Sequence, residues 1–322
     1  MKIKLTSFLQ WKYNIIAYQI LGWKFCLFYL MALGKLYYLI NRKEKKKIIE
    51  SVEYVYSYRK EYHDIKTIVK DVFRGILSHY YEKIYNAYEN IEILDQFFKN
   101  NISTDCLEKL DDALMKGKGV LLVTGHYGGI EYIPIFLALK NYPVSVIAKF
   151  ATEQLEKTTV EKTRPIGINI LNAAKSKNVL INIMGELKQN RVVFFECDEI
   201  EEWKPSDKEK ISFLHKLIVV DRTINIIQKR TSAEIIFGLL HRTNLFQYRF
   251  ILKNRKDMSV RFAGNPVTIG VAILKTLEDY IYSFPEEWYQ WKNFADIESP
   301  SFVANYKETV PYSPAEPVLN NI

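Results

Sequence analysis

The 322-residue sequence has few of the residues that build covalent or metal-bound frameworks: three cysteines and five histidines. Cys26, Cys106 and Cys197 are far apart, no two have metal-ligand spacing, and their odd number argues against a disulfide framework. No G-x-S-x-G nucleophile elbow and no recognised nucleic-acid-binding motif occurs. We therefore expect a protein of a reducing compartment that uses no metal and no cofactor and binds no nucleic acid.

The sequence also lacks internal repeats, low-complexity linkers and a convincing cleavable signal peptide. Hydrophobic residues make up 48% of the chain and charged residues 25%, which is enough apolar surface for a sizeable core. Lysine and arginine number 45 against 37 aspartate and glutamate, a formal net charge of +8. This basic balance favours anionic partners such as phospholipid headgroups or phosphorylated substrates.

Residues 1–58 have the character of a membrane-associated helical segment. The chain is strongly apolar and aromatic from Tyr13 to Leu33, although Lys24 interrupts it, and a spanning helix needs ~20 predominantly apolar residues. The basic run Arg42–Lys47 follows. The pattern favours a helix at the cytoplasmic face of a membrane, as a peripheral helix or a single span. A buried helix of a soluble core is the alternative.

The remaining chain divides into a helical lead-in at 59–117, an α/β domain at 118–300 and a C-terminal tail at 301–322. In the α/β domain, short β-branched runs alternate with helical patterns, which predicts a mainly parallel central sheet flanked by helices. Strands are expected at 120–123, 144–147, 192–195, 234–239, 248–252 and 259–263. Helices are expected at 132–139, 152–162, 175–189, 221–231 and 268–283.

The stretch from Gly119 to Glu131 is the strongest candidate for chemistry. A buried strand is followed by His126, at the strand end where α/β sheets place their ligands. Gly128 and Gly129 allow a substrate to approach the backbone closely. Glu131, five residues after His126, is placed to hold the imidazole in one tautomer while His126 acts as general base. The plainer interpretation is a capping histidine beside a surface glutamate.

The segment Gly125-His126-Tyr127-Gly128-Gly129-Ile130-Glu131 resembles the H-x4-D/E motif of glycerolipid acyltransferases, in the glutamate form of the lipid A acyltransferase branch. The motif of that branch has asparagine and tryptophan where this chain has Gly129 and Ile130. Further similarities follow in the same order along roughly residues 15–295: the segments 164–167, 192–198, 231–236 and 285–291, and Arg242.

The resemblance implies an enzyme that moves a fatty acyl group from acyl carrier protein or acyl-CoA to a hydroxyl or amine of an anionic lipid or glycolipid acceptor. It also implies work at the cytoplasmic face of the cell inner membrane. Two alternatives stay open. An acyl-thioester hydrolase would use water as the acceptor, and a non-catalytic membrane-surface protein would keep the fold without the transfer.

Three further residues are candidates for substrate binding. Arg164 could fork onto an acceptor phosphate, and the resemblance places it in the cleft of His126; a surface ion pair with Glu161 is the alternative. Lys149 ends a predicted strand and is a second candidate cation. Asp198 ends another, beside Glu196, Glu199, Glu201 and Glu202, and is expected to position the acceptor. Clustered carboxylates can bind a metal, but acidic turns of this kind are usually only solvated.

Overall fold

The computed structural model describes residues 9, 11–58, 64–150, 153–199, 203, 205–262 and 267–297. By its contacts the chain forms two compact units. Unit 1 comprises Met1–Asn90 and Phe284–Glu298, and unit 2 comprises Ile91–Ser283 and Ser299–Ile322. The predicted tail 301–322 lies outside the described residues.

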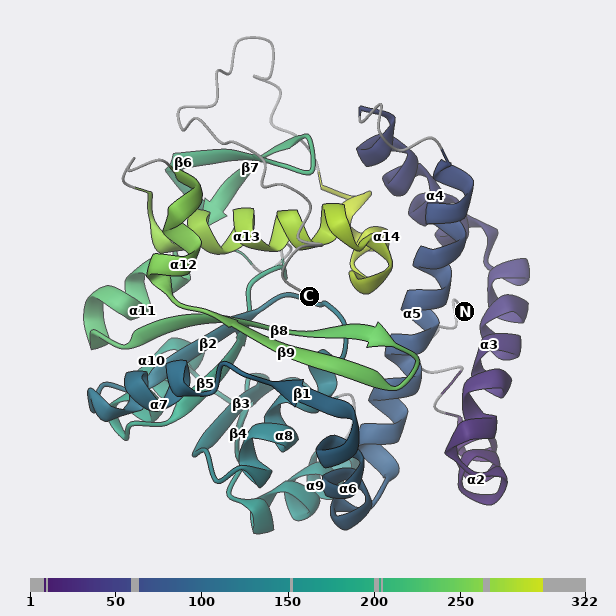
Figure 1. Cartoon of the computed structure of the whole chain (residues 1–322), viewed down its shortest axis with the longest axis horizontal. Helices are drawn as coiled ribbons and strands as arrows, with labels where there is room; N and C mark the ends of the chain where they lie inside the picture. Colours follow the sequence, from purple (N-terminus) through teal and green to yellow (C-terminus); the bar gives the residue numbers. More distant parts are fainter. Residues whose placement is uncertain are drawn as a thin grey trace. The chain divides into compact units, whose positions relative to one another are not determined.

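The core of unit 2 is a seven-stranded sheet in the order β1-β9-β8-β2-β5-β3-β4 (Figure 1). All neighbouring strands pair in parallel except the β8–β9 hairpin. This confirms the predicted α/β class with a mainly parallel sheet. The strands are β1 (Ile102–Thr104), β2 (Val120–Thr124), β3 (Val144–Ala148), β4 (Asn169–Asn172), β5 (Val192–Glu196), β8 (Glu234–Asn244) and β9 (Gln247–Lys253).

Strand β2 lies inside the sheet, between β8 and β5, and all five of its residues are buried. Its continuous apolar sequence is typical of a strand covered on both faces. The register pairs Val120 with Val192 and Thr124 with Glu196. Because β2 and β5 are parallel and end at the same level, the chain leaves both strands side by side at the carboxyl edge of the sheet, where α/β proteins bind ligands.

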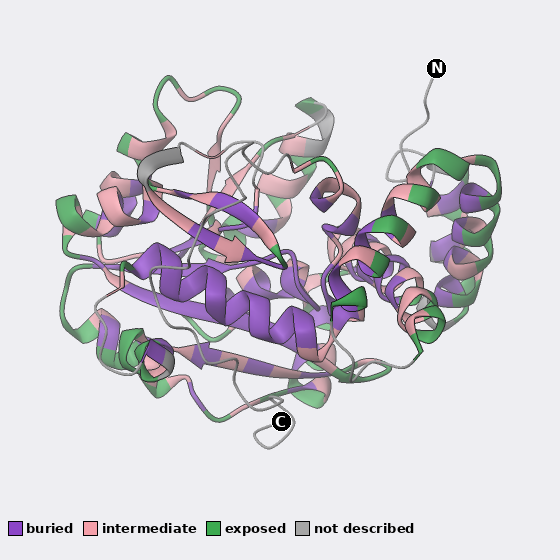
Figure 2. Ribbon diagram, turned by 90° about the horizontal axis from the view of Figure 1, so that it is seen from above, coloured by how far each residue is buried: buried purple, intermediate pink, exposed green. Residues whose placement is uncertain are grey.

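The helices of unit 2 agree with the predicted order, except that α12 was not predicted. They are α6 (Ile91–Asn101), α7 (Glu108–Met115), α8 (Ile133–Leu139), α9 (Glu153–Thr163), α10 (Val179–Lys188), α11 (Thr223–Thr231), α12 (Arg255–Ser259) and α13 (Ile269–Ser283). Helix α13 is buried along nearly its whole length (Figure 2). Its Tyr280 ring packs edge-on against Tyr127, 5.9 Å between centroids, just beyond the end of β2.

The predicted strand at 259–263 is wrong. Asn254 caps helix α12 by accepting from the Asp257 amide, while the Asp257 side chain accepts from the Asn254 amide. This reciprocal capping box starts a helix, and the chain continues as the short 3-10 helix η4 (Val260–Phe262). A separate antiparallel hairpin, β6 (Pro205–Phe213) and β7 (Lys216–Asp221), was not predicted.

Unit 1 contains the predicted N-terminal segment as helices, but the apolar stretch is two helices. They are α2 (Lys12–Leu21) and α3 (Trp23–Ile40), separated by Gly22 with a φ of 77°. Tyr29 on α3 donates to Asn14 on α2, 3.1 Å, so the two helices fold against each other. No helix among the described residues is long and apolar enough to cross a membrane. The next helices are α4 (Arg42–Ser57) and α5 (Ile65–Tyr88).

The chain returns to unit 1 after α13, through η5 (Pro285–Glu287) and α14 (Trp291–Phe294). The Tyr289 ring stacks on His79 of α5, 3.5 Å between centroids, and Gly75 of α5 lies so close to the Glu286 carbonyl that no Cβ would fit. Trp288 and Trp291 are fully buried and pack edge-on. This segment is therefore a structural part of the helical unit.

Candidate active site

His126 lies two residues beyond β2, in a tight turn at the carboxyl edge of the sheet. The Tyr127 amide donates to the Gly125 carbonyl, 2.7 Å, and the Gly129 amide donates to the Leu240 carbonyl of β8, 2.8 Å. A Cβ on Gly129 would lie 3.0 Å from Leu240, so a larger residue is disfavoured there. The 3-10 helix η1 (Ile130–Tyr132) and α8 follow. Strand and turn thus fix the backbone that carries the imidazole.

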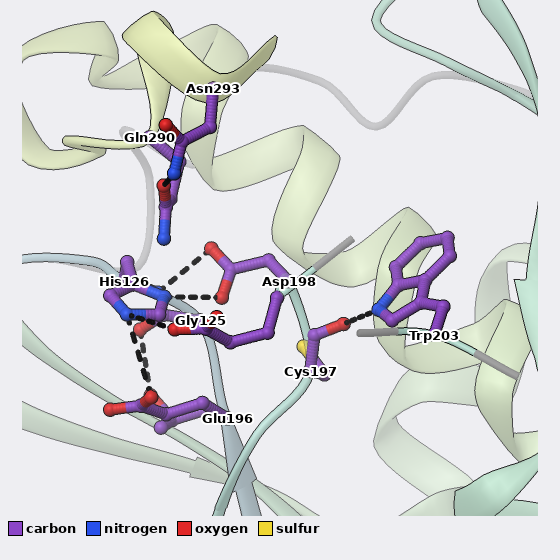
Figure 3. Close-up of polar contacts among 10 residues, drawn as sticks. Gly125, His126, Glu196, Cys197, Asp198, Trp203, Gln290 and Asn293 are labelled. Atoms are coloured by element: carbon purple, nitrogen blue, oxygen red, sulfur yellow. Dashed lines mark hydrogen bonds and ion pairs between the residues drawn. The ribbon is translucent and has the colours of Figure 1, made fainter. Parts of the chain in front are cut away.

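Asp198 holds His126 at two points (Figure 3). Its Oδ1 lies 2.8 Å from Nδ1 of the imidazole, and its Oδ2 accepts the His126 amide, 2.9 Å. The Asp198 side chain has no exposed surface, and the His126 side chain is 11% exposed. An ionised carboxylate at Nδ1 keeps the proton on that nitrogen and directs Nε2 away from it.

Two glutamates lie at the Nε2 side of the ring. Oε2 of Glu196, the last residue of β5, is 3.4 Å from Nε2, and Oε1 of Glu199 is 3.2 Å from it. Both are half-buried, with side chains 37% and 45% exposed. Figure 3 shows Asp198 and Glu196 on different sides of the ring. The reactive nitrogen therefore faces a carboxylate-lined end of the site that solvent reaches.

The carboxylates set the protonation of His126. Burial alone lowers the pKa of His126, but the charges of Asp198 and Glu196, with the hydrogen bonds that the ring donates to Asp198 and Glu199, raise it well above 6.5. Burial and neighbouring carboxylates raise the pKa of Glu196 against the lowering effect of His126. The hydrogen bond from His126 lowers the pKa of Glu199. The carboxylates therefore favour the charged imidazolium form of His126.

Glu131 lies in η1 and is half-buried. Its charge raises the pKa of Glu196, so it belongs to the same group of carboxylates. Asp198 makes the contact with the imidazole, at Nδ1, that was expected of Glu131. A part for Glu131 in holding His126 stays a prediction.

The two candidate cations, Lys149 and Arg164, lie at opposite edges of the sheet. Lys149 follows β3 at the carboxyl edge, is exposed, and lowers the pKa of Glu199 by its charge. Arg164 lies in η2 (Arg164–Ile166), between α9 and the start of β4. The Gly167 carbonyl next to it accepts from Arg191, 2.9 Å, which immediately precedes β5. Arg164 is thus at the amino edge of the sheet, and strands of five residues, about 13 Å long, separate that edge from His126.

Cys197 and His241 are unsuited to nucleophilic or acid–base work. Burial and the charge of Asp198 raise the pKa of the Cys197 thiol well above 9.0, so it stays protonated. Burial, with Arg242 and Arg249, lowers the pKa of His241 to about 4, and its Nδ1 lies 2.9 Å from the Tyr127 hydroxyl. His241 is therefore a neutral, buried structural histidine.

Sequence reasoning singled out Asp198 but not its contact with His126, and placed Glu196 and Glu199 only in the acidic cluster beside it. A signal for Asp198 was present: the apolar runs that start at Val120 and Val192 have equal lengths. Pairing them in parallel register puts His126 opposite Asp198, each two residues after its strand. Glu196 is the last residue of β5, and Glu199 lies in the turn after it. This turn has no recognisable sequence pattern.

Comparison with known proteins identifies the family of the chain. No curated protein matches the chain. The family model that does match, over residues 3–293, describes the bacterial lipid A biosynthesis acyltransferases. The match covers the described residues of unit 2, with the His126 site, and nearly all described residues of unit 1. The chain therefore belongs to the bacterial lipid A biosynthesis acyltransferase family.

Proposed function

We propose that the protein moves a fatty acyl group from an acyl thioester, carried by acyl carrier protein or coenzyme A, to a hydroxyl or amine of an anionic lipid or glycolipid. The family supports an acyltransferase of lipid biosynthesis. The observation that carries the finer proposal is the buried His126 imidazole, held at Nδ1 by Asp198 with Nε2 turned to the open end of the site. This is the arrangement of a general base with its orienting acid.

The reaction needs His126 in its neutral form. The proton on Nε2 passes to a carboxylate or to water; Glu196, whose pKa is raised, is a suitable recipient 3.4 Å away. The acceptor then takes the place of the glutamates at Nε2 and loses its proton to the imidazole. Its oxygen or nitrogen attacks the thioester carbonyl to form a tetrahedral intermediate. When the C–S bond breaks, the thiolate leaves and is protonated by Nε2, which returns His126 to its neutral form.

The developing oxyanion needs hydrogen-bond donors. The Gly129 amide already donates to Leu240, so it is unsuited to this role. The Ile130 amide begins the first turn of η1, where helical N–H groups have no acceptor within the helix. We assign the oxyanion to this turn, with Gly128 and Gly129 shaping the backbone beside it.

The anionic acceptor approaches a strongly acidic site, so a cation nearby is needed to hold it. Lys149 is exposed at the carboxyl edge and acts on Glu199, so it is the candidate that the geometry favours. Arg164 is exposed at the other edge, and binding of an acceptor phosphate by its guanidinium stays a prediction from the family resemblance. Asp198 acts on the acceptor through His126.

The helices of unit 1 supply a surface suited to the membrane interface. Helices α2 and α3, with Trp11 before them, expose many large apolar side chains, more than a soluble surface usually gathers in one segment. These are Trp11, Tyr13, Ile16, Ile20, Leu21, Phe25, Phe28, Leu36, Leu39 and Ile40. The basic run Arg42–Lys47 begins α4 and suits anionic headgroups. We propose peripheral binding at the cytoplasmic face of the inner membrane.

The test is acyl transfer by the purified full chain. A labelled acyl thioester is incubated with and without membrane lipid extract, and products are separated and identified by mass spectrometry. Labelled lipid formed only with the extract supports the proposal and identifies the acceptor. Release of free fatty acid at the same rate without lipid would instead identify a thioester hydrolase, since water can reach Nε2. Absence of both products would leave a non-catalytic membrane-surface protein.

A further inference from the structure

The open side of His126 has the composition of a metal site. One imidazole nitrogen and two carboxylates converge there, and the ligand atoms of His126, Glu196 and Glu199 all lie within 4.8 Å of one another. We propose that these three side chains bind one Zn²⁺ ion, and that the bound ion reversibly inhibits the enzyme. Imidazole with carboxylates is a donor set that zinc accepts.

The distances agree with zinc coordination. Zinc binds imidazole nitrogen at about 2.0–2.1 Å and carboxylate oxygen at about 2.0–2.2 Å, usually with tetrahedral geometry. Two ligand atoms on such an ion are therefore about 3.3–3.5 Å apart. The Nε2 atom of His126 lies 3.4 Å from Oε2 of Glu196 and 3.2 Å from Oε1 of Glu199. The pairs that include the histidine thus need little movement to accept the ion.

The surroundings of the imidazole also suit a metal ligand. Histidine ligands typically donate their second ring N–H to a carboxylate, which fixes the tautomer and the ring orientation. Asp198 provides this contact at Nδ1, 2.8 Å, and its other oxygen holds the backbone amide of the same histidine. The partial exposure of Glu196 and Glu199 gives the ion a path from solvent and leaves a position for water.

Inhibition follows from the lone pair. Zinc displaces the proton of Nε2 to solvent and occupies the electron pair that the proposed general base uses to accept a proton, so an occupied site cannot start the transfer. Only this consequence depends on the proposed function. Mg²⁺ and Ca²⁺ prefer six or more oxygen ligands and are expected to bind poorly to a site with one imidazole and two carboxylates.

The test is titration of the metal-free full chain with ZnCl₂ by isothermal titration calorimetry. We expect one Zn²⁺ per chain, no binding to this site in His126→Ala, and affinity reduced at least about tenfold in Glu199→Gln, which keeps the shape of a half-exposed side chain. The control is His215→Asn: His215 is exposed, lies outside the cluster, and has a φ of 65° that asparagine tolerates. Zinc affinity should be unchanged in this control.

The outcomes separate the site from the reaction. Absence of saturable Zn²⁺ binding, or binding that neither His126→Ala nor Glu199→Gln weakens, would overturn the metal site whether or not the chain transfers acyl groups. Stoichiometric binding that both variants weaken supports it, even in a preparation without transfer activity. In an active preparation, transfer should fall in proportion to zinc occupancy and return with EDTA; full activity at saturating zinc would refute the inhibition.

Discussion

The substitution Asp198→Asn is the most informative single change in the site. It preserves the shape of a fully buried side chain but removes its charge and replaces one acceptor oxygen with a donor NH₂. Asp198 accepts at both oxygens, from Nδ1 of His126 at 2.8 Å and from the backbone amide of the same residue at 2.9 Å. The variant amide can satisfy only one of these two donors.

The size of the effect follows from those two contacts. Each hydrogen bond to a charged group contributes ~1.5–3 kcal/mol; one of the two is lost and the other loses its charge, so the cost lies between ~1.5 and ~6 kcal/mol. Since 1.36 kcal/mol corresponds to a factor of ten, the expected loss in kcat is about 10–10⁴, which overlaps the range in which general-base catalysis contributes. The pKa of His126 should also fall, because the charge of Asp198 is the first of those that raise it.

Two assays check this reasoning. Steady-state transfer on the identified acceptor gives kcat, and NMR titration of the imidazole resonances gives the pKa of His126. The matched control is Glu131→Gln, which also removes one carboxylate charge without changing shape. The geometry predicts a smaller loss for Glu131→Gln than for Asp198→Asn. A transfer rate near that of the unsubstituted protein in Asp198→Asn, or an unchanged histidine pKa, would refute the role given to Asp198.

Three further predictions follow from the charges and the exposed surface. Because the pKa of His126 is raised, the neutral imidazole forms only at higher pH, and the acidic limb of kcat/KM should lie above pH 6.5. The stability that the charged imidazole contributes is full below pH 6.5 and should be lost as pH rises through the raised pKa. Activity and denaturation measured against pH check the two expectations. Phe28→Ser should weaken flotation with anionic liposomes while Val260→Ser, equally exposed but in unit 2, should not, and equal loss in both would contradict the assigned surface. Lys149→Ala should raise the KM for the anionic acceptor about tenfold, as loss of one charge-assisted contact would, while Arg164→Ala should change it less than twofold; the reverse order would return the acceptor to Arg164.

The buried strands could be predicted from the sequence because continuous apolar runs have few other uses in a chain of this kind. The expected strands at 120–123, 144–147 and 192–195 correspond to β2, β3 and β5. The predicted strand at 259–263 is wrong because side-chain capping at Asn254 starts a helix. This local interaction outweighs the strand preference of the β-branched residues. The break at Gly22 was missed because apolar periodicity continues across it.

The candidate site divides in the same way. His126 could be found because strand, glycines and histidine lie together in the sequence. Its partner Asp198 follows strand β5 and lies 72 residues later in the chain. The contact depends on sheet order and register, which cannot be read from a single sequence. The placement of Arg164 also depends on topology, because helix α9 carries the chain from the carboxyl edge of β3 to the amino edge of β4.

The central claim is that Nε2 of His126 is the base that activates the acceptor. Its most direct test is single-turnover transfer from a labelled acyl thioester by His126→Ala, with the fold checked by circular dichroism and thermal denaturation. We predict a rate lower by about 10²–10⁴ in a protein that remains folded, because general-base assistance contributes that factor. A folded His126→Ala protein that transfers the acyl group at a rate near that of the unsubstituted chain would contradict the account.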